Sequence, residues 1–361
     1  MQTITQEFVK NKKVLLRYDI DVALECKVQS AKCKVKEDFK LKAGLSTLKL
    51  CLENAAKVII IGHLGRPFAT ASEEEKGNPP ELSAKPIQEW LQNILGKEVD
   101  FAQTLDQAAR SQNKLVLLEN VRFFHGEVPG AEYHSSCTSK TCDIDFAHQL
   151  ANLGEVYVNE AFSAHNDGAS TTMVPTLLPH AAGLHFIKEV ETLLKVRNSP
   201  KKPFIVIMGG AKVKDKLPVI SVLAKNADAV LVGGRIASEI TLTSTIVERN
   251  VMVGKLNEEG TDLALETVES WRGLIIGAKM IVWNGPVGKF EDPKNNGTQK
   301  VARMILDSGA EVVIGGGDSV AALSQYGLLQ EAEEKTFVSV GGGAMLKLLE
   351  TGTLPTIEVL Q

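Results

Sequence analysis

The sequence predicts an α/β protein built from two doubly wound, parallel-sheet domains joined by a helix. The chain has 361 residues, and domains average about 150 residues, so two domains are expected. Its short apolar runs are continuous rather than alternating, which is typical of parallel strands covered on both faces. Amphipathic segments separate these runs, and strand–helix alternation predicts parallel sheets with right-handed crossovers.

Residues 1–187 form the first predicted domain. Its expected strands are Lys13–Tyr18, Lys57–Gly62, Lys114–Leu118 and Glu155–Val158. Helical spacing of apolar residues predicts helices over Leu41–Ala55 and Ala84–Leu95. Two stretches, Phe68–Ser83 and Phe124–Ile144, are expected to be surface insertions, because they are rich in residues typical of loops.

Residues 188–202 are expected to form the linking helix, and residues 203–349 the second domain. Apolar residues at helical spacing lead up to Asn198-Ser199-Pro200, which ends the helix. The strands expected after it are Phe204–Met208, Ala229–Gly233, Met280–Trp283, Glu311–Gly315 and Phe337–Gly341. The helices expected between them are Lys214–Ala224, Thr261–Gly277 and Thr298–Ser308.

Composition narrows the possible partners and the compartment. Lys and Arg number 40 and Asp and Glu 44, a balance that argues against a general nucleic-acid surface. No apolar run reaches the roughly 18 residues of a membrane span, and Met1–Lys13 lacks the apolar core of a signal peptide. Five cysteines are few for this length, so free thiols in a reducing cytoplasm are expected. The spacings Cys26 to Cys33 and Cys137 to Cys142 do not suit a zinc site.

Glycine clusters follow many apolar runs of the second domain. They are Gly209-Gly210, Gly233-Gly234, Gly315-Gly316-Gly317 and Gly341-Gly342-Gly343, with Trp283-Asn284-Gly285-Pro286 ending another run. The ends of parallel strands share one edge, where ligands bind, and glycine lets backbone N–H groups approach phosphate. One such cluster could simply make a tight turn, but several on one edge indicate phosphate binding. No Gly-Lys pair precedes Ser or Thr as in a P-loop, and the dinucleotide fingerprint lacks its third glycine at Val320.

Over Lys13–Leu360 the sequence resembles the phosphoglycerate kinase family. The motifs that carry the resemblance are Arg17-Tyr-Asp19, His63-Leu-Gly-Arg66-Pro67, Glu119-Asn-Val-Arg122-Phe123, Val158-Asn-Glu-Ala-Phe162, Gly209-Gly-Ala-Lys212-Val-Lys-Asp-Lys216, Trp283-Asn-Gly-Pro-Val-Gly-Lys-Phe-Glu291, Gly315-Gly-Gly-Asp318-Ser319 and Gly341-Gly-Gly-Ala. The resemblance implies two doubly wound domains that face each other across a cleft. It also implies that the C-terminal tail, residues 350–361 and above all Leu354–Gln361, packs on the first domain.

The reaction that the resemblance implies is reversible transfer of the acyl phosphate of 1,3-bisphosphoglycerate to Mg-ADP. The products are ATP and 3-phosphoglycerate, as in glycolysis. The implied cofactor is Mg²⁺, carried with ADP or ATP, and the family is usually monomeric. Domain closure around the substrates is expected before transfer, with the linking helix and Ser163–Thr172 as candidate hinges.

The second domain is expected to hold the nucleotide. Lys212 and Lys216 lie near the start of a predicted helix and suit the transferring and terminal phosphates. Asp318 can hold Mg²⁺ directly or through water, and Ser319 with neighbouring N–H groups can bind phosphate. By resemblance Glu291 contacts the ribose. The resemblance assigns the remaining nucleotide site to Gly210, Ala211, Gly233, Gly234, Asn284, Gly285, Gly316 and Gly317, the last with a catalytic role beside both lysines.

The first domain is expected to hold the three-carbon acid. Carboxylate and phosphate groups favour arginine, because a planar guanidinium binds oxyanions through two hydrogen bonds. Arg66 and Arg122, with His63, are the strongest candidates, whereas Arg17 either joins them or pairs with a carboxylate inside the sheet. The resemblance adds the remaining candidates, which are Asp19, Asp21, His165 and Asn166 for substrate binding and Lys40 for catalysis.

The sequence departs from the family pattern within this acid-binding half. Asp21 replaces an asparagine, Lys40 aligns with a catalytic arginine, and Asn166 and Gly168 replace an arginine and a histidine. In the second domain Arg235 replaces a third glycine, and Ala264-Leu265 replaces Gly-Pro near the adenine pocket. Three functions therefore stay open: an active phosphoglycerate kinase with a rearranged pocket, a catalytically impaired relative that binds Mg-nucleotide in a regulatory role, and a kinase for a related, less charged acid.

Overall fold

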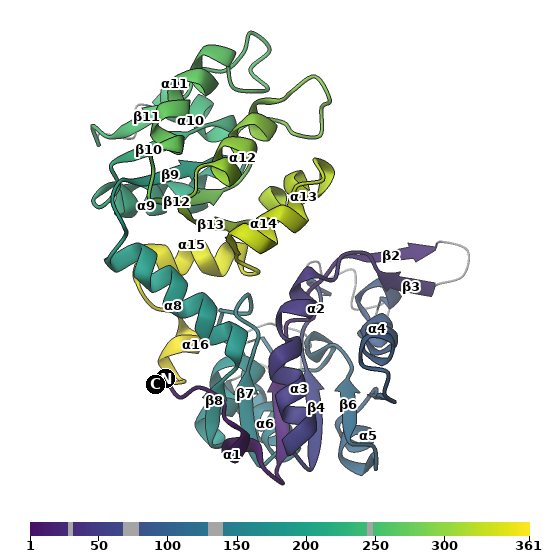
Figure 1. Cartoon of the computed structure of the whole chain (residues 1–361). Coiled ribbons are helices and arrows are strands. Elements are labelled where there is room, and N and C mark those ends of the chain that lie inside the picture. Colours follow the sequence, from purple (N-terminus) through teal and green to yellow (C-terminus); the bar gives the residue numbers. More distant parts are fainter. Residues whose placement is uncertain (28–31, 68–78, 129–139, 244–247) are drawn as a thin grey trace. The chain divides into compact units, whose positions relative to one another are not determined.

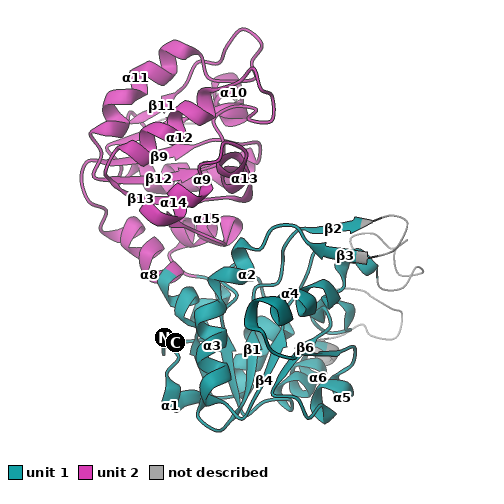
Figure 2. Cartoon of the chain, turned by 45° about the vertical axis from the view of Figure 1, so that its right-hand side comes forward, with its two compact units in different colours: residues 1–188, 354–361 teal, residues 189–353 magenta. Residues whose placement is uncertain are grey.

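The computed structural model describes residues 1–27, 32–67, 79–128, 140–243 and 248–361, and it divides into two compact units (Figure 2). Unit 1 consists of Met1–Lys188 with Leu354–Gln361, and unit 2 of Glu189–Thr353. Each unit contains a six-stranded sheet whose neighbouring strands are all parallel. The prediction of two parallel-sheet α/β domains is confirmed.

The sheet of unit 1 has the strand order β5-β6-β4-β1-β7-β8, of which Figure 1 labels β6, β4, β7 and β8. Its strands are β1 (Lys13–Arg17), β4 (Lys57–Ile61), β5 (Asp100–Ala102), β6 (Leu115–Leu118), β7 (Val156–Asn159) and β8 (His180–Ala182). The α-helices of this unit are α1 (Gln6–Val9), α2 (Phe39–Ala43), α3 (Leu45–Asn54), α4 (Lys85–Leu95), α5 (Leu105–Arg110), α6 (Lys140–Ala151), α7 (Val174–Leu177) and α16 (Pro355–Glu358). Short 3-10 segments cover η2 (Pro80–Leu82) and η3 (Val121–Phe123), and η4 (Ala169–Met173) is a π-helical turn.

Both faces of this sheet are buried. On one face Leu16 and Ile60 join a core cluster with Leu48 of α3 and Leu91 of α4. Neighbouring residues point to the opposite face of a strand, and there too the side chains of Leu15, Ile59, Val116 and Tyr157 are at most 1% exposed. The continuous apolar runs of the sequence follow from this double coverage.

The sheet of unit 2 has the order β11-β10-β9-β12-β13-β14. Its strands are β9 (Phe204–Met208), β10 (Ala229–Val232), β11 (Val251–Val253), β12 (Met280–Asn284), β13 (Glu311–Gly315) and β14 (Phe337–Val338). Its helices are α9 (Val213–Ala224), α10 (Gly234–Thr243), α11 (Leu265–Ile276), α12 (Gly297–Asp307), α13 (Gly317–Gln325), α14 (Leu329–Lys335) and α15 (Gly342–Thr351). The linking helix is α8 (Leu184–Asn198), which continues from unit 1 into unit 2.

The helix predicted over Leu41–Ala55 is two helices, α2 and α3, which meet at Gly44. A Cβ at Gly44 would come within 2.5 Å of the Tyr18 ring, so the chain turns where the ring packs against its backbone. The Tyr18 hydroxyl donates a hydrogen bond to the carbonyl of Leu41 in α2. Apolar periodicity does not report this break, because the buried residues on both sides keep helical spacing.

The expectation that the cysteines are free thiols is wrong for two of them. Cys26 and Cys33 form a disulfide bond between β2 (Leu24–Lys27) and β3 (Lys32–Val35), an antiparallel hairpin that the sequence interpretation missed. Cys51 is a buried free thiol, and Cys137 lies outside the described residues. Two cysteines seven residues apart can also face each other across neighbouring antiparallel strands, as Cys26 and Cys33 do here, so this spacing does not by itself distinguish free thiols from a disulfide.

The two predicted surface insertions extend into the residues that the structure leaves undescribed, 68–78 and 129–139. The expectation for Phe124–Ile144 holds for the exposed His125 but is wrong for other described residues. Glu127 is buried, with only 5% of its surface exposed, and α6 already begins at Lys140. Among the described helices, none is both long enough and apolar enough to cross a membrane.

Candidate functional site

In unit 1 the candidate acid-binding residues gather around a cavity of about 300 Å³ at the carboxyl end of β1 and β4. Its lining includes Arg17, His63, Arg66, Arg122 and Asn166. Arg17 is the last residue of β1, and His63 follows β4 by two residues. Arg122 lies in η3, just after β6, so three adjacent parallel strands deliver these side chains to one edge.

The sequence left open whether Arg17 faces the acid-binding site or pairs with a carboxylate. In the structure it lines the cavity and is also connected, through Ser170, to the carboxylate of Glu127. Its side chain is 1% exposed and donates hydrogen bonds to Ser170 Oγ at 3.0 Å and His63 Nδ1 at 2.7 Å. The Ser170 hydroxyl donates in turn to Glu127 Oε1 at 2.6 Å. Burial raises the pKa of Glu127, while the nearby Arg17 charge opposes that rise.

Four basic residues of unit 1 lie close enough to His63 to affect its pKa. Burial lowers the pKa of His63 well below its usual value, and the positive charges of Arg17, Arg122, Lys40 and Arg66 lower it further. His63 is therefore a neutral imidazole near neutral pH. An anion that enters this cavity is therefore attracted by the guanidinium groups, while the neutral His63 can offer it a hydrogen bond but no charge.

Asp19, Asp21 and Lys40 lie next to the cavity rather than in its lining. Asp19 is 4% exposed and accepts a hydrogen bond from the Ser163 hydroxyl, and its Oδ1 lies 3.9 Å from Lys40 Nζ. Asp21 Oδ1 accepts the N–H of Gly65 at 2.9 Å, and its Oδ2 lies 3.8 Å from His63 Nε2. Asp21 thus anchors the loop that follows β4 and contains Gly65 (the Gly65 loop), and an asparagine oxygen could make the same contact. Asp21 also adds a negative charge beside His63.

His165 is not among the residues that line the cavity, and its Nδ1 lies 3.0 Å from the carbonyl oxygen of Ser163. Gly168 contributes backbone to the lining, and a Cβ there would lie 3.0 Å from both the Glu127 carbonyl oxygen and Thr171 Oγ1. This tight packing leaves little room for the histidine of the family pattern. Glu127, Ser163 and Thr171 also line the cavity and were missed, because none of them carries a motif of its own.

In unit 2 the glycine clusters meet at the carboxyl edge of the sheet, as their positions after neighbouring strands require. The Gly210 N–H donates to the Pro286 carbonyl at 2.7 Å, and the Gly234 N–H donates to the Val287 carbonyl at 2.7 Å. A Cβ at Gly285 would come within 2.4 Å of Lys216 Nζ and of the Gly209 carbonyl oxygen. Gly285 has a φ of 88°, so both the space and the backbone conformation require glycine.

Lys216 is the central cation of this edge. Lys216 is 6% exposed, and its ammonium group donates hydrogen bonds to the carbonyl oxygens of Gly209 and Asn284. Burial lowers the pKa of Lys216 to about 8, Asp318 opposes that effect, and Lys212 adds to it. Lys216 therefore interacts electrostatically with both Lys212 and Asp318, which are exposed whereas Lys216 is buried.

The remaining nucleotide-site candidates differ in how they are exposed. Ala211, Glu291 and Gly317 are exposed, whereas Gly233, Gly234 and Asn284 are buried in the strand ends, and Gly316 is half-buried. Ser319, which is expected to bind phosphate together with neighbouring N–H groups, uses its hydroxyl for contacts within the protein. That hydroxyl is fully buried, donates to the Gly315 carbonyl and accepts the Gly285 N–H, so it ties two strand ends together.

Comparison with known proteins finds matches to one family over nearly the whole chain. The model of the family described as "Phosphoglycerate kinase" matches residues 4–247 and 236–352. A phosphoglycerate kinase of Herpetosiphon aurantiacus is 34% identical over 99% of this chain and 98% of its own length. A phosphoglycerate kinase of Fervidobacterium nodosum is also 34% identical, over 98% of this chain and 97% of its own length.

Solved structures agree in fold. Phosphoglycerate kinase from Pyrococcus horikoshii OT3 superposes with a TM-score of 0.81 at 25% identity, covering all of this chain and 98% of the other. The enzyme from Coxiella burnetii gives a TM-score of 0.77 at 27% identity, covering 98% of this chain and 96% of the other. The chain belongs to the phosphoglycerate kinase family.

Proposed function

We propose that this chain is a working phosphoglycerate kinase, which moves the acyl phosphate of 1,3-bisphosphoglycerate to Mg-ADP and runs in reverse from 3-phosphoglycerate and ATP. Family membership makes it a phosphotransferase. The observation that carries the proposal for the acid is the cavity of unit 1, where Arg17, Arg66 and Arg122 lie around the neutral His63. We further propose that the enzyme works as a monomer in the cytoplasm.

The acid has two anionic ends, and the cavity offers matching groups. A guanidinium holds a carboxylate or phosphate through paired, charge-assisted hydrogen bonds. Arg66 is exposed and Arg122 is half-buried, so we assign them to direct contact with the oxyanions. Arg17 is committed to Ser170, the Tyr18 carbonyl and His63, so we assign it to the orientation of His63 and to the positive potential of the cavity.

The residues of unit 2 fit Mg²⁺ bound together with a nucleotide. The Asp318 carboxylate is exposed on the first turn of α13, near Lys216 and Lys212. Among the described residues, no three acidic, histidine or cysteine side chains converge to hold a metal without help. Mg²⁺ commonly takes one or two carboxylates and completes its shell with phosphate oxygens and water. Asp318 would hold it, directly or through water, and the ion would neutralise charge on the phosphates.

The chain's own residues then position the phosphoryl group and stabilise its charge, which is most of what such a transfer requires. Lys216 lies among the Gly209, Gly210 and Gly285 backbone and would meet the transferring phosphoryl oxygens, while the exposed Lys212 would meet the terminal phosphate. The backbone at Gly316 and Gly317 would approach the same oxygens. Lys40, next to Asp19, would stabilise the acyl-phosphate end. Transfer in line requires the acid and the nucleotide to meet, so closure of the two units is part of the proposal.

A second candidate function is a catalytically impaired relative that binds Mg-nucleotide in a regulatory role. It is favoured by Asn166, which lines the cavity where the family pattern has an arginine, and by the extra negative charge of Asp21. Loss of one charge-assisted hydrogen bond, where Asn166 replaces an arginine, costs about 1.5–3 kcal/mol and would weaken acid binding by roughly tenfold to a hundredfold, and the charge of Asp21 would weaken it further. A third candidate, a kinase for a related and less charged acid, follows from the same two residues.

A coupled assay with 3-phosphoglycerate and Mg-ATP, combined with calorimetric titration of Mg-ADP, separates these functions. Turnover with 3-phosphoglycerate supports the proposed function. Intact Mg-ADP binding without turnover of any small phosphorylated or hydroxylated carboxylic acid supports the impaired relative. Turnover of a different acid in such a panel, with none of 3-phosphoglycerate, supports the third candidate.

A further inference from the structure

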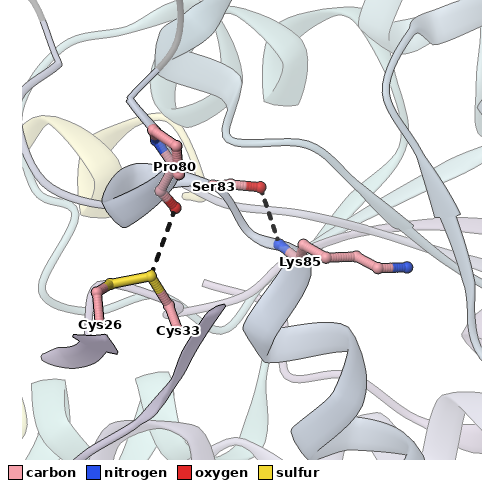
Figure 3. The surroundings of a disulfide bond; sticks show 5 residues. All are labelled: Cys26, Cys33, Pro80, Ser83 and Lys85. Carbon is pink, nitrogen blue, oxygen red and sulfur yellow. Dashed lines mark hydrogen bonds between the residues drawn. A yellow bond between two sulfur atoms is a disulfide. The ribbon is translucent and has the colours of Figure 1, made fainter. Parts of the chain in front are cut away.

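The disulfide bond of unit 1 joins two directly opposed residues of the β2–β3 hairpin (Figure 3). The Cα atoms of Cys26 and Cys33 are 4.0 Å apart, and Cys26 pairs with Cys33 in the strand register. The Lys36 N–H donates to the Ala23 carbonyl, so the alternation of an antiparallel ladder makes Cys26 and Cys33 a non-hydrogen-bonded pair. Side chains lie closest at such pairs, so this bond can form and break without any exchange of ladder partners.

The disulfide lies outside the hydrophobic core, where a reductant can reach it. Leu24 and Val35, at the base of the hairpin, pack against the core of unit 1, whereas Cys26 and Cys33 are half-buried and lie outside it. Cys51 provides the contrast, because it is buried and burial raises its thiol pKa to about 12. Thiolates rather than thiols exchange with disulfides, so Cys51 is expected to be inert.

One route from the disulfide to the acid-binding cavity passes through η2. Cys33 Sγ lies 4.0 Å from the Pro80 carbonyl oxygen at the start of η2, as Figure 3 shows. At the end of η2, Leu82 packs so tightly on Gly65 that a Cβ there would come within 2.5 Å of it. The Gly65 N–H is bound by Asp21, and its carbonyl accepts a hydrogen bond from Arg122.

A second route is the chain itself. The hairpin is the covalent connection between Asp21, which holds the Gly65 loop, and Lys40, which lies beside Asp19. A two-stranded hairpin is only marginally stable by itself, so a covalent bond between its strands restricts both of its ends. Both routes end on residues around the acid, and neither includes a residue of unit 2.

We propose that Cys26 and Cys33 are a redox-active pair whose oxidised form holds the unit 1 cavity in its acid-binding arrangement. The proposal rests on the proposed function, because 3-phosphoglycerate is taken as the ligand. A dithiol of the dithiothreitol or thioredoxin class supplies the two electrons. One of its thiolates attacks a sulfur of the pair and expels the other, which takes up a proton; its second thiolate then closes the reductant's own disulfide and releases the remaining cysteine, which is also protonated. Reoxidation runs the same exchange backwards against a small disulfide.

Redox equilibration of the full chain tests the chemistry without any need for turnover. The protein is equilibrated with mixtures of reduced and oxidised dithiothreitol, its thiols are trapped by alkylation, and the labelled peptides are weighed by mass spectrometry. We expect Cys26 and Cys33 to change together from linked to alkylated over one two-electron transition. Alkylation of both cysteines at every mixture, including fully oxidised dithiothreitol, would overturn the proposal.

Binding of 3-phosphoglycerate, measured by calorimetry on the oxidised and reduced protein, tests the coupling. We expect reduction to weaken binding by at least about fivefold, the lower end of typical coupling between sites, and to leave Mg-ADP binding unchanged. The double variant C26S/C33S should match the reduced protein and ignore dithiothreitol. The matched control C137S/C142S, which also removes two cysteines, should keep the redox response.

Equal affinity of the oxidised and reduced forms for 3-phosphoglycerate would overturn the coupling. Absence of 3-phosphoglycerate binding in both forms would overturn the coupling together with the proposed acid substrate, and intact Mg-ADP binding would then show that the chain is folded. A redox transition of the pair that leaves acid binding unchanged would contradict the coupling alone, so its failure is distinguishable from failure of the proposed function.

Discussion

The Arg17 guanidinium donates a hydrogen bond to Nδ1 of His63 across 2.7 Å in the interior of unit 1. Arginine carries only donors, so Nδ1 must be the acceptor and the imidazole proton must reside on Nε2. Nε2 lies 3.8 Å from Asp21 Oδ2, on the side of the Gly65 loop. The pairing therefore fixes the tautomer of His63 and leaves a neutral N–H donor beside the acid-binding cavity.

His63 should remain neutral across the physiological pH range. Burial and four surrounding cations lower its pKa well below the usual value, and protonation at Nδ1 would break the bond from Arg17. Nitrogen NMR of the labelled protein should show a single Nε2–H imidazole with constant shifts from about pH 6 to about pH 8, where an ordinary histidine titrates. A titration of His63 within that range would contradict the assigned tautomer.

Lys216→Ala should abolish turnover while leaving the fold intact. The substitution removes the buried ammonium that binds the Gly209 and Asn284 carbonyls at the carboxyl edge of the unit 2 sheet. Loss of one donor aimed at developing charge typically costs a factor of about 10² to 10³ in kcat. The coupled assay measures this loss, and circular dichroism checks the fold. Lys214→Ala is the matched control, an exposed lysine of the same helix, and should keep normal activity. Unchanged turnover of Lys216→Ala would contradict the role given to Lys216.

The pH dependence of kcat/KM for Mg-ATP should show a limb from the same lysine. Burial lowers the pKa of Lys216 to about 8 in the free enzyme. Below that pH the ammonium is charged and attracts phosphate; as pH rises through about 8 the charge is lost, so kcat/KM should fall on the alkaline side. The acid side should show no limb from this group. A profile of kcat/KM that stays flat through this pH would show that Lys216 remains charged or does not meet phosphate.

The sequence predicted the central strands well, because their burial on both faces leaves a continuous apolar signature. Every predicted strand of unit 2 overlaps an observed one, although β14 keeps only Phe337–Val338 of the predicted Phe337–Gly341. The edge strands β5, β8 and β11 were missed, since three residues each give too short a pattern. The β2–β3 hairpin was missed for another reason, because its alternating charged and apolar residues are covered on one face only.

The candidate sites could be predicted only where a residue type carried chemistry within a motif. Arginines and glycines at strand ends were found this way, and the structure brings Arg66, Arg122 and His63 to one cavity. Glu127 could not be found, because its significance lies in a hydrogen bond to Ser170, 43 residues away in the sequence. The contacts of the Ser319 hydroxyl within the protein could not be predicted from the sequence either, because they depend on the Gly285 N–H at the end of a neighbouring strand.

Lys40→Arg should raise the rate of phosphoryl transfer. Lys40 lies near the start of α2, with its ammonium 3.9 Å from Asp19 Oδ1, where the family pattern has an arginine. A guanidinium could bind Asp19 and still offer a second pair of N–H groups to the acyl phosphate, which a single ammonium cannot do. We expect kcat to rise with little change in KM for Mg-ATP. Lys42→Arg, on the same helix and paired with Asp38, should have no effect. A fall in kcat/KM for Lys40→Arg would show that the cavity has adapted to lysine.

Asp21→Asn should tighten binding of 3-phosphoglycerate. The asparagine oxygen can still accept the Gly65 N–H, so the loop keeps its anchor, while the negative charge beside His63 is removed. Asp21 is 38% exposed, so solvent screens its charge. We therefore expect KM for the acid to fall by only about twofold to fivefold. This decrease in KM should become smaller at high salt, because exposed charges are screened there. Asp106→Asn, an exposed carboxylate of α5 paired with Arg110, is the control and should leave KM unchanged. If Asp21→Asn instead raises KM, the carboxylate itself contributes to acid binding, and the departure at residue 21 is an adaptation rather than a loss.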